Sequence, residues 1–351
     1  MSKFTVGLIG VVAAVLAVIF VVNTFEFSPV QSVQRGFRGL AMEENITARA
    51  AAAKAVANRL PEPAPAVDKA NRKASQEYKN LKVLGDMDAN DFLRLMTDIT
   101  TWVSPEQGCA YCHDENDLAA DRPYTKIVSR RMLEMVRYIN GSWKIHVADT
   151  GVTCWACHRG QPVPANTWSE PLPPRAFRTV GTRISQNKGS ETAAFSSLPN
   201  ETFGSFLKAS EDLRVVPATR VLHSRDMASM QATEATYGFM MHVSQGLGVN
   251  CTYCHNSRSF VAWDQSTPQR ATAWYGIRMT RALNNEFLEP LKPVFPENRL
   301  GPMGDVLKSN CATCHEGNAK PLNGVSMIKD YPILVGPAPA RTAAAAPAKA
   351  K

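Results

Sequence analysis

The longest apolar run of the chain lies near the amino terminus. Residues Phe4 to Val22 are uncharged, and 19 apolar residues are long enough to cross a bilayer as one helix. The run ends in Phe20-Val-Val-Asn-Thr-Phe-Glu, which lacks the small-x-small pattern of a signal-peptide cleavage site. We therefore expect a retained single-pass anchor rather than a cleaved leader.

The rest of the chain alternates helical and irregular stretches. Apolar residues recur at helical spacing in four segments, Phe92–Thr101, Lys126–Asn140, Glu234–Gln245 and Ala271–Phe287. Residues 24–42 indicate an extended segment, and the alanine-rich residues 43–60 predict a surface helix. Prolines 61, 63 and 65 end that helix and give a semi-rigid spacer. The tail 336–351 is rich in Ala, Pro and Lys and predicts disorder.

The cysteines change this picture most. All eight fall in four copies of Cys-x-x-Cys-His: Cys109-Ala-Tyr-Cys112-His113, Cys154-Trp-Ala-Cys157-His158, Cys251-Thr-Tyr-Cys254-His255 and Cys311-Ala-Thr-Cys314-His315. This unit is the attachment signature of c-type haem: the two thiols form thioethers and the histidine is the proximal iron ligand. Zinc sites do not require histidine directly after the second cysteine, and a disulfide framework would not repeat one five-residue unit. The sequence therefore predicts four covalently bound haem c groups.

Composition and charge agree with an exported, folded haem protein. Of 351 residues, 44% are hydrophobic and 20% charged, as in globular chains. The formal charge of +8 would suit nucleic acid. The propionates of four haems would cancel most of that excess, so we expect no nucleic-acid partner.

The spacing of methionines indicates an internal repeat. Met96 lies 13 residues before Cys109, and Met240 lies 11 before Cys251. Met135-Val-Arg-Tyr-Ile-Asn140 is echoed by Met279-Thr-Arg-Ala-Leu-Asn284. We therefore predict a mainly α-helical multihaem cytochrome with long irregular segments, built from two pseudo-repeated two-haem units. The expected divisions are 1–23 anchor, 24–79 extended segment and linker, 80–165 first unit, 166–229 connection, 230–335 second unit and 336–351 tail.

A haem that only carries electrons needs two axial ligands from the protein. Four of the seven histidines belong to the motifs, leaving His146, His223 and His242, so methionine must serve at some haems. The best candidates are Met96 and Met240, on predicted helices upstream of their motifs, with Met241 and His242 as competitors of Met240.

Two ligand choices stay open at this point. Met132 and Met135 share a helical face before Cys154, and the repeat favours Met135 because it aligns with Met279. His146 lies only 8 residues before Cys154, close for the same haem, so it could serve a neighbouring haem or bond a propionate. We expect His223 to be structural.

Several longer stretches carry a resemblance to a family. They are Gly36-Phe-Arg-Gly-Leu-Ala-Met42, Trp143-Lys-Ile-His146-Val-Ala-Asp-Thr-Gly-Val-Thr-Cys154 and Met240-Met-His-Val-Ser-Gln-Gly-Leu-Gly-Val-Asn-Cys251. With the four motifs, they make residues 24–335 resemble the tetrahaem cytochrome c subunit of the purple-bacterial photosynthetic reaction centre.

The resemblance implies a set of axial ligands. The pairs would be Met96 with His113, Met132 with His158, Met240 with His255 and His146 with His315. It thereby favours Met132 over Met135 and gives His146 a crossed role. If His146 does not bind the haem of His315, Met279 is the next candidate.

The resemblance also implies function and place. Electrons would pass from a soluble periplasmic carrier, a c-type cytochrome or a high-potential iron–sulfur protein, to the photo-oxidised bacteriochlorophyll pair. The haem domain would lie in the periplasm on the photosynthetic inner membrane, against the L and M subunits and the light-harvesting antenna. Many members begin with a lipid-modified cysteine before Phe-Glu; here Thr24 precedes Phe25, which fits a transmembrane anchor.

Five acidic residues surround the first motif, where the family receives its donor: Glu106, Asp114, Glu115, Asp117 and Asp121. They could form a rim that steers a basic carrier, or a solvated loop. Two other functions compete with the main one: a membrane-anchored carrier for a respiratory reductase or oxidase, and a multihaem enzyme with one open iron site. Candidate ligands exist for all four haems, so we expect an electron-transfer subunit and no enzyme.

Overall fold

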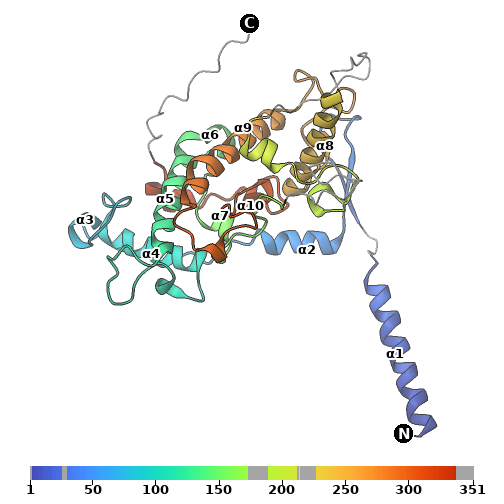
Figure 1. Ribbon diagram of the computed structural model, residues 1–351, viewed down its shortest axis with the longest axis horizontal. Helices are drawn as coiled ribbons and strands as arrows, with labels where there is room; N and C mark the ends of the chain where they lie inside the picture. The colour runs from blue at the N-terminus through green and yellow to red at the C-terminus, as the bar shows by residue number, and fades with distance from the viewer. Residues whose placement is uncertain (1, 26–29, 173–188, 212, 214–226, 337–351) are drawn as a thin grey trace.

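The computed structural model describes residues 2–25, 30–172, 189–211, 213 and 227–336. His223, the tail after residue 336 and much of the predicted connection lie outside this part. The described chain is mainly helical, with long irregular segments between the helices (Figure 1). The only strands that it contains are β1 (Gln31–Gln34) and β2 (Glu43–Ile46), which pair as an antiparallel hairpin.

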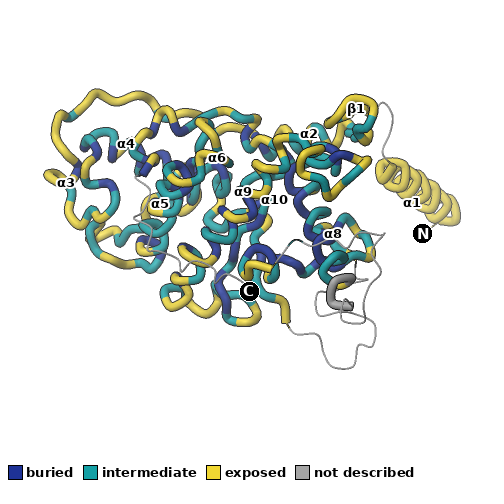
Figure 2. Tube along the Cα trace, turned by 90° about the horizontal axis from the view of Figure 1, so that it is seen from above, coloured by how far each residue is buried: buried dark blue, intermediate teal, exposed yellow. Residues whose placement is uncertain are grey.

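Helix α1 (Lys3–Asn23) stands away from the rest of the molecule. None of its residues is buried, and it is exposed along its whole length (Figure 2). Its mean hydropathy reaches 2.9, and it is the only helix in the described ranges long and apolar enough to cross a membrane. The predicted apolar helix is therefore present.

Four long helices frame the body. They are α4 (Ala89–Val103), α5 (Tyr124–Ser142), α8 (Met227–Leu247) and α9 (Pro268–Ala282), which a π-helical turn extends over Leu283–Leu288. Short helices are α2 (Ala48–Ala57), α3 (Ala74–Glu77), α6 (Lys144–Val147), α7 (Trp155–His158) and α10 (Cys311–His315). The four helices predicted from apolar spacing are thus found, each longer than its periodic core.

One expectation on the amino-terminal side needs correction. The segment 43–60 was expected to be one surface helix, but its first residues form β2 and only Ala48–Ala57 is helical. The hairpin explains the difference: Glu43 and Ile46 pair with Gln34 and Gln31, so these residues satisfy their backbone groups across strands.

The core consists of three clusters of buried side chains. The first joins α4 and α5 to the chain end, where Trp102 packs edge-on against Tyr331 at 5.1 Å. The second surrounds Phe239 of α8. The third joins Ile139 of α5 to Met279 of α9. Because residues near 330 pack against α4, the predicted first and second units are interlocked by their side chains.

Candidate haem-binding site

A cavity of about 1150 Å³ runs through the body between α4, α5 and α9. Residues of the first, second and fourth Cys-x-x-Cys-His motifs line it, together with Tyr253 of the third. Its volume exceeds the ~300–1,000 Å³ usual for a single small ligand. The cavity is therefore large enough to hold more than one cofactor beside these motifs.

The first and third motifs share one backbone arrangement. Each lies on a short 3₁₀ turn, Gly108–Tyr111 and Cys251–Tyr253. The Nδ1 atom of the motif histidine bonds the carbonyl five residues later, His113 to Leu118 at 2.8 Å and His255 to Phe260 at 2.7 Å. Further along each loop, a threonine hydroxyl donates to the motif tyrosine carbonyl, Thr125 to Tyr111 and Thr267 to Tyr253.

The second and fourth motifs share a more compact arrangement. Helices α7 and α10 each end in a left-handed residue, Arg159 and Glu316. Here the histidine Nδ1 atom bonds the carbonyl three residues later, His158 to Gln161 and His315 to Asn318, both at 2.9 Å.

These bonds decide which ring nitrogen is free. A carbonyl oxygen can only accept, so each motif histidine carries its proton on Nδ1 and leaves the Nε2 lone pair available to iron. Burial lowers the pKa of His158, and it lowers that of His315 to about 4, which keeps both rings neutral as a ligand must be. The geometry and protonation of the motifs therefore fit haem.

His146 lies outside the motifs but makes the same kind of Nδ1 hydrogen bond to a backbone carbonyl. Its Nδ1 atom donates to the Thr272 carbonyl of α9 at 2.9 Å, and its ring lies across the cavity from that of His315, with centroids 6.0 Å apart. A Cβ on Gly276 would lie 2.5 Å from His146 Cε1, so only glycine at that position leaves room for the ring. His146 and His315 can therefore address one iron from opposite sides.

The sequence did not point to Thr272 or Gly276. Both lie within a helix that the apolar pattern predicted, and the only signal was a glycine inside a helical pattern. Such a glycine costs about 1 kcal/mol relative to alanine and calls for a packing reason, which the His146 ring supplies.

The candidate methionines differ in their surroundings. Met96 on α4 lines the cavity near the first motif and packs against the first core cluster, and Met132 and Met135 on α5 line the cavity as well. Met135, however, packs against the cluster that contains the buried Met279. The two methionines that the repeat aligned thus share one apolar contact region, which is the role of core filler.

Around the third motif, the two competing candidates His242 and Met240 differ in how deeply they are buried. His242 is buried between Phe203 and Phe239, its ring centroid 4.5 Å from that of Phe203. Burial lowers its pKa to about 4. Met240 is half-buried on α8, 11 residues before Cys251. His242 is therefore part of the core, and Met240 stays the candidate ligand.

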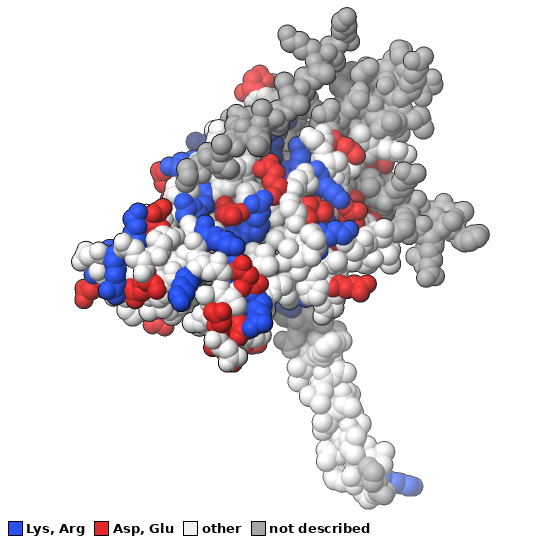
Figure 3. All heavy atoms as spheres, turned by 60° about the vertical axis from the view of Figure 1, so that its left-hand side comes forward, with Lys and Arg blue, Asp and Glu red and all other residues white. Residues whose placement is uncertain are grey.

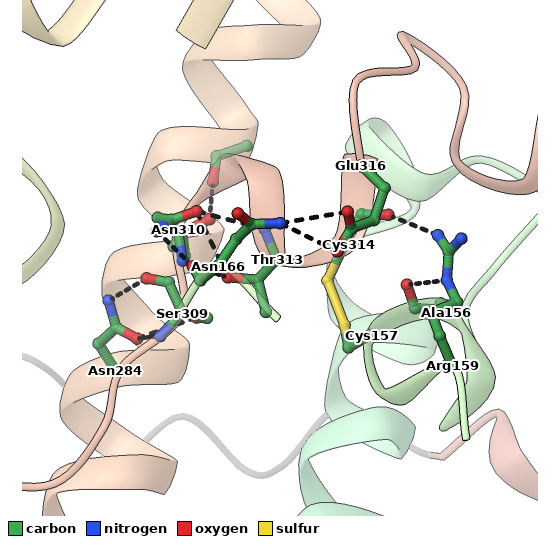
Figure 4. The surroundings of a disulfide bond; sticks show 12 residues. Ala156, Cys157, Arg159, Asn166, Asn284, Ser309, Asn310, Thr313, Cys314 and Glu316 are labelled. Carbon is green, nitrogen blue, oxygen red and sulfur yellow. Dashed lines mark hydrogen bonds between the residues drawn. A yellow bond between two sulfur atoms is a disulfide. The ribbon is translucent and has the colours of Figure 1, made fainter. Parts of the chain in front are cut away.

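The second and fourth motifs are in direct contact. Cys157 and Cys314 are joined by a disulfide, with their Cα atoms 4.5 Å apart (Figure 4). Arg159 reinforces the contact by donating from Nη2 to the Cys314 carbonyl at 3.1 Å. A disulfide and a thioether are alternative fates of one sulfur, so haem attachment at these two predicted positions requires the reduced thiols.

The fourth motif also touches the third through α8. Gly317 donates its N–H to the Gly246 carbonyl at 2.9 Å, and a Cβ on Gly248 would lie 2.0 Å from the Gly317 oxygen. Between the first and second motifs, Gly160 donates to the Trp102 carbonyl of α4 at 2.9 Å. Contacts thus connect the motifs in the order first, second, fourth, third.

A loop from the amino-terminal segment covers the third motif. Thr252 donates its hydroxyl to the Arg35 carbonyl at 3.0 Å and accepts from the Met42 N–H at 2.8 Å. A Cβ on Gly36 would lie 2.3 Å from the Thr252 oxygen. Residues 35–42 therefore join the third motif to the side of the molecule that carries β1 and α1, opposite α3 and α4 (Figure 2).

The predicted acidic rim is partly neutralised. Asp114 pairs with Arg122 at 2.7 Å, and Asp121 with Arg130 at 2.7 Å. The hydrogen bond from Arg130 is the main reason that the pKa of Asp121 falls to about 2. Acidic and basic side chains accordingly interleave over the α3–α4 side (Figure 3). Glu106, Glu115 and Asp117 are exposed and show no ion pair with another described residue.

A mainly helical chain with Cys-x-x-Cys-His histidines whose Nε2 atoms are free defines a c-type cytochrome. Residues 26–335 match the family described as photosynthetic reaction centre cytochrome C subunit. The chain belongs to this family.

Curated relatives agree with the family assignment, and three are named photosynthetic reaction center cytochrome c subunit. That of Rubrivivax gelatinosus is 48% identical, covering 92% of this chain and 87% of the relative. Those of Thermochromatium tepidum and Roseobacter denitrificans are 45% and 38% identical, covering 92% and 94% of this chain and 81% and 91% of theirs. The chain is therefore a haem-bearing electron-transfer protein that associates with a photosynthetic reaction centre at the membrane.

Proposed function

We propose that the chain carries electrons from a soluble periplasmic donor through four covalent haems to the photo-oxidised bacteriochlorophyll pair. The observation that carries this proposal is the series of contacts that links the motifs. The first is linked to the second through α4, the second to the fourth through Arg159 and Cys314, and the fourth to the third through α8. Such a series lets an electron enter at one end of the body and leave at the other.

Each iron has a proposed pair of axial ligands. They are Met96 with His113, Met132 with His158, Met240 with His255 and His146 with His315. Among the described residues Met132, unlike Met135, packs against none of the three core clusters, which supports Met132. Met279 is a buried member of the third cluster, which supports His146 over Met279. Because methionine raises the potential relative to a second histidine, the fourth haem is the one that differs in ligation.

The two ends of the series differ in a way that supports a direction of electron transfer. The third motif is bonded to residues 35–42, between β1 and β2. β1 lies on the side of the molecule that bears α1 (Figure 2), which we take to be a retained membrane anchor. The loop of the third motif exposes Phe260, Val261 and Trp263, and apolar surface of this kind suits the fixed membrane subunits L and M, with the antenna beyond them. The first motif lies at the far end, where a soluble cytochrome or iron–sulfur protein would dock near Glu115 and Asp117.

The arrangement of two pseudo-repeated two-haem units belongs to the same proposal. The matching hydrogen bonds of the first and third motifs, and those of the second and fourth, support it. A carrier for a respiratory oxidase would use the same four ligand pairs. The two functions are therefore distinguished by whether light oxidises the haems.

The test is flash spectroscopy on native membranes. A saturating flash should oxidise α-band haem within a millisecond, and added reduced donor should restore it. Membranes from a strain that lacks only this chain are the control and should show the oxidised pair persisting. Pigment-containing wild-type membranes with no haem response would refute the proposal and favour the respiratory carrier.

A further inference from the structure

The first haem site contains a buried lysine that bonds the loop after its motif histidine. The other buried lysine of the described chain, Lys308 near the fourth motif, is instead paired with Asp305 and Glu289. Lys126 lies in the first turn of α5, beneath the loop that follows His113, with 8% of its surface exposed. Its Nζ atom donates to the Leu118 and Ala120 carbonyls, each at 2.6 Å. It lines the same cavity as His113.

The Leu118 carbonyl is shared. It accepts from Lys126 Nζ and also from His113 Nδ1, at 2.8 Å. A carbonyl that already receives a charge-assisted bond offers less electron density to a second donor. The hydrogen bond from His113 is therefore weaker, and the His113 ring is a less basic iron ligand as a result.

The third site shows the contrast. Its loop is also held from beneath by a cation, because Arg270 donates to the Ala262 carbonyl at 3.0 Å. Arg270 does not bond the Phe260 carbonyl, which accepts from His255. Among the described residues, the carbonyls of Gln161 and Asn318 likewise receive no side-chain donor besides their histidines.

The charge of Lys126 is not cancelled by a direct partner. In the described ranges no carboxylate lies within ion-pair distance of its Nζ atom. Asp121 and Asp117 attract it from farther away, and Asp121 is engaged by Arg130 and Lys82. A cation held this way beside a haem favours the reduced, less positive iron. A weaker histidine bond acts in the same direction, because a less basic ligand stabilises ferric iron less.

We propose that Lys126 is a positioning residue that raises the reduction potential of the first haem by sharing the Leu118 carbonyl with His113. The proposal rests on the proposed role of His113 as an axial ligand. It gives the entry haem a higher potential than its methionine and histidine ligands alone would set.

Lys126→Met tests this in the full-length holocytochrome, by potentiometric titration of the resolved α-bands. The variant should lower the reduction potential of the first haem by at least about 59 mV, which is a tenfold shift of its one-electron equilibrium toward the oxidised form. The potentials of the other three haems should stay unchanged. Lys82→Met is the matched control, because it removes an exposed charge that pairs with Asp121 of the same loop without touching Leu118. Lys126→Arg should stay close to wild type.

A second readout separates tuning from mere support of the loop. In the reduced, diamagnetic protein, the Nδ1–H proton of His113 should move downfield in Lys126→Met, since its bond to Leu118 strengthens. If Lys126→Met fails to assemble, Lys126→Gln, which keeps one donor but loses the charge, should show both shifts at smaller size.

Two results overturn the proposal: a potential shift in Lys126→Met or Lys126→Gln no larger than that in Lys82→Met, or an upward shift of the first-haem potential in either of them. Failure of the wider function is distinguishable, because it would appear as wild-type membranes whose haems do not respond to a flash.

Discussion

The loops after the first and third motifs have the same backbone and opposite surfaces. In both, an Asx turn follows the histidine, as Asp114 accepts from Asn116 and Asn256 from Arg258. The first loop then carries acidic residues, whereas the third exposes Trp263 over 54% of its surface. Local hydrogen bonds thus fix how a haem is held, and the outward side chains determine what each end of the molecule can meet.

The largest expected effect comes from exchanging the methionine ligand at either end. Met96→His and Met240→His should each lower the potential of their own haem by about 0.1 V, within the ~0.8 V range that axial ligands set. Redox titration resolves the two sites. Met135→Leu is the control, because Met135 lines the cavity but is not a proposed ligand, and it should leave all potentials in place. An unchanged third haem in Met240→His would remove Met240 from the ligand set.

Next in size is the effect of the cover that residues 35–42 give the third motif. Gly36→Ala places a Cβ against the Thr252 oxygen at a φ of +129°, so we expect a loss of about 2–3 kcal/mol in unfolding free energy. Gly108→Ala beside the first motif has a φ of +63° and open space, and should cost about 1 kcal/mol. Equal melting temperatures for the two variants would show that the cover contributes nothing.

A smaller effect is expected from the apolar end. Trp263→Ala should weaken binding to the solubilised membrane subunits about tenfold, or about 1.4 kcal/mol, as loss of a central aromatic contact does. Leu118, exposed over 61% of its surface at the first loop, supplies the matched control. Leu118→Ala should bind those subunits like wild type. Equal losses of affinity in both variants would show that the two ends of the molecule do not differ in binding to the membrane subunits.

The smallest effect concerns the charged end. The double variant Glu115→Gln, Asp117→Asn should slow haem re-reduction by a basic donor about threefold at low salt and not at high salt, because screening removes long-range attraction. Asp264→Asn, an exposed acid on the third loop, should change nothing. A double variant that keeps the wild-type rate at both low and high salt would show that the acidic residues form only a solvated loop.

Prediction from sequence succeeded where a signal is local. The Cys-x-x-Cys-His units and the four amphipathic helices are short-range patterns, and both led to the correct class of protein. The hairpin at Glu43 was missed because the helix was predicted from alanine content, which carries no information about pairing with the strand at Gln31–Gln34. The contacts His146–Thr272 and Thr252–Met42 span 126 and 210 residues, and no periodicity reports them. The role of Lys126 depends on which carbonyl its amine reaches, which a helical pattern does not contain.

The direction of the haem series is the central claim, and time-resolved flash spectroscopy with resolved α-bands tests it most directly. In membranes with all four haems reduced, a single flash should oxidise the third haem first, and the electron vacancy should reach the first haem last. Oxidation that appears at the first haem before the third would contradict the account, because it would place the acidic end, and not the apolar end, against the reaction centre.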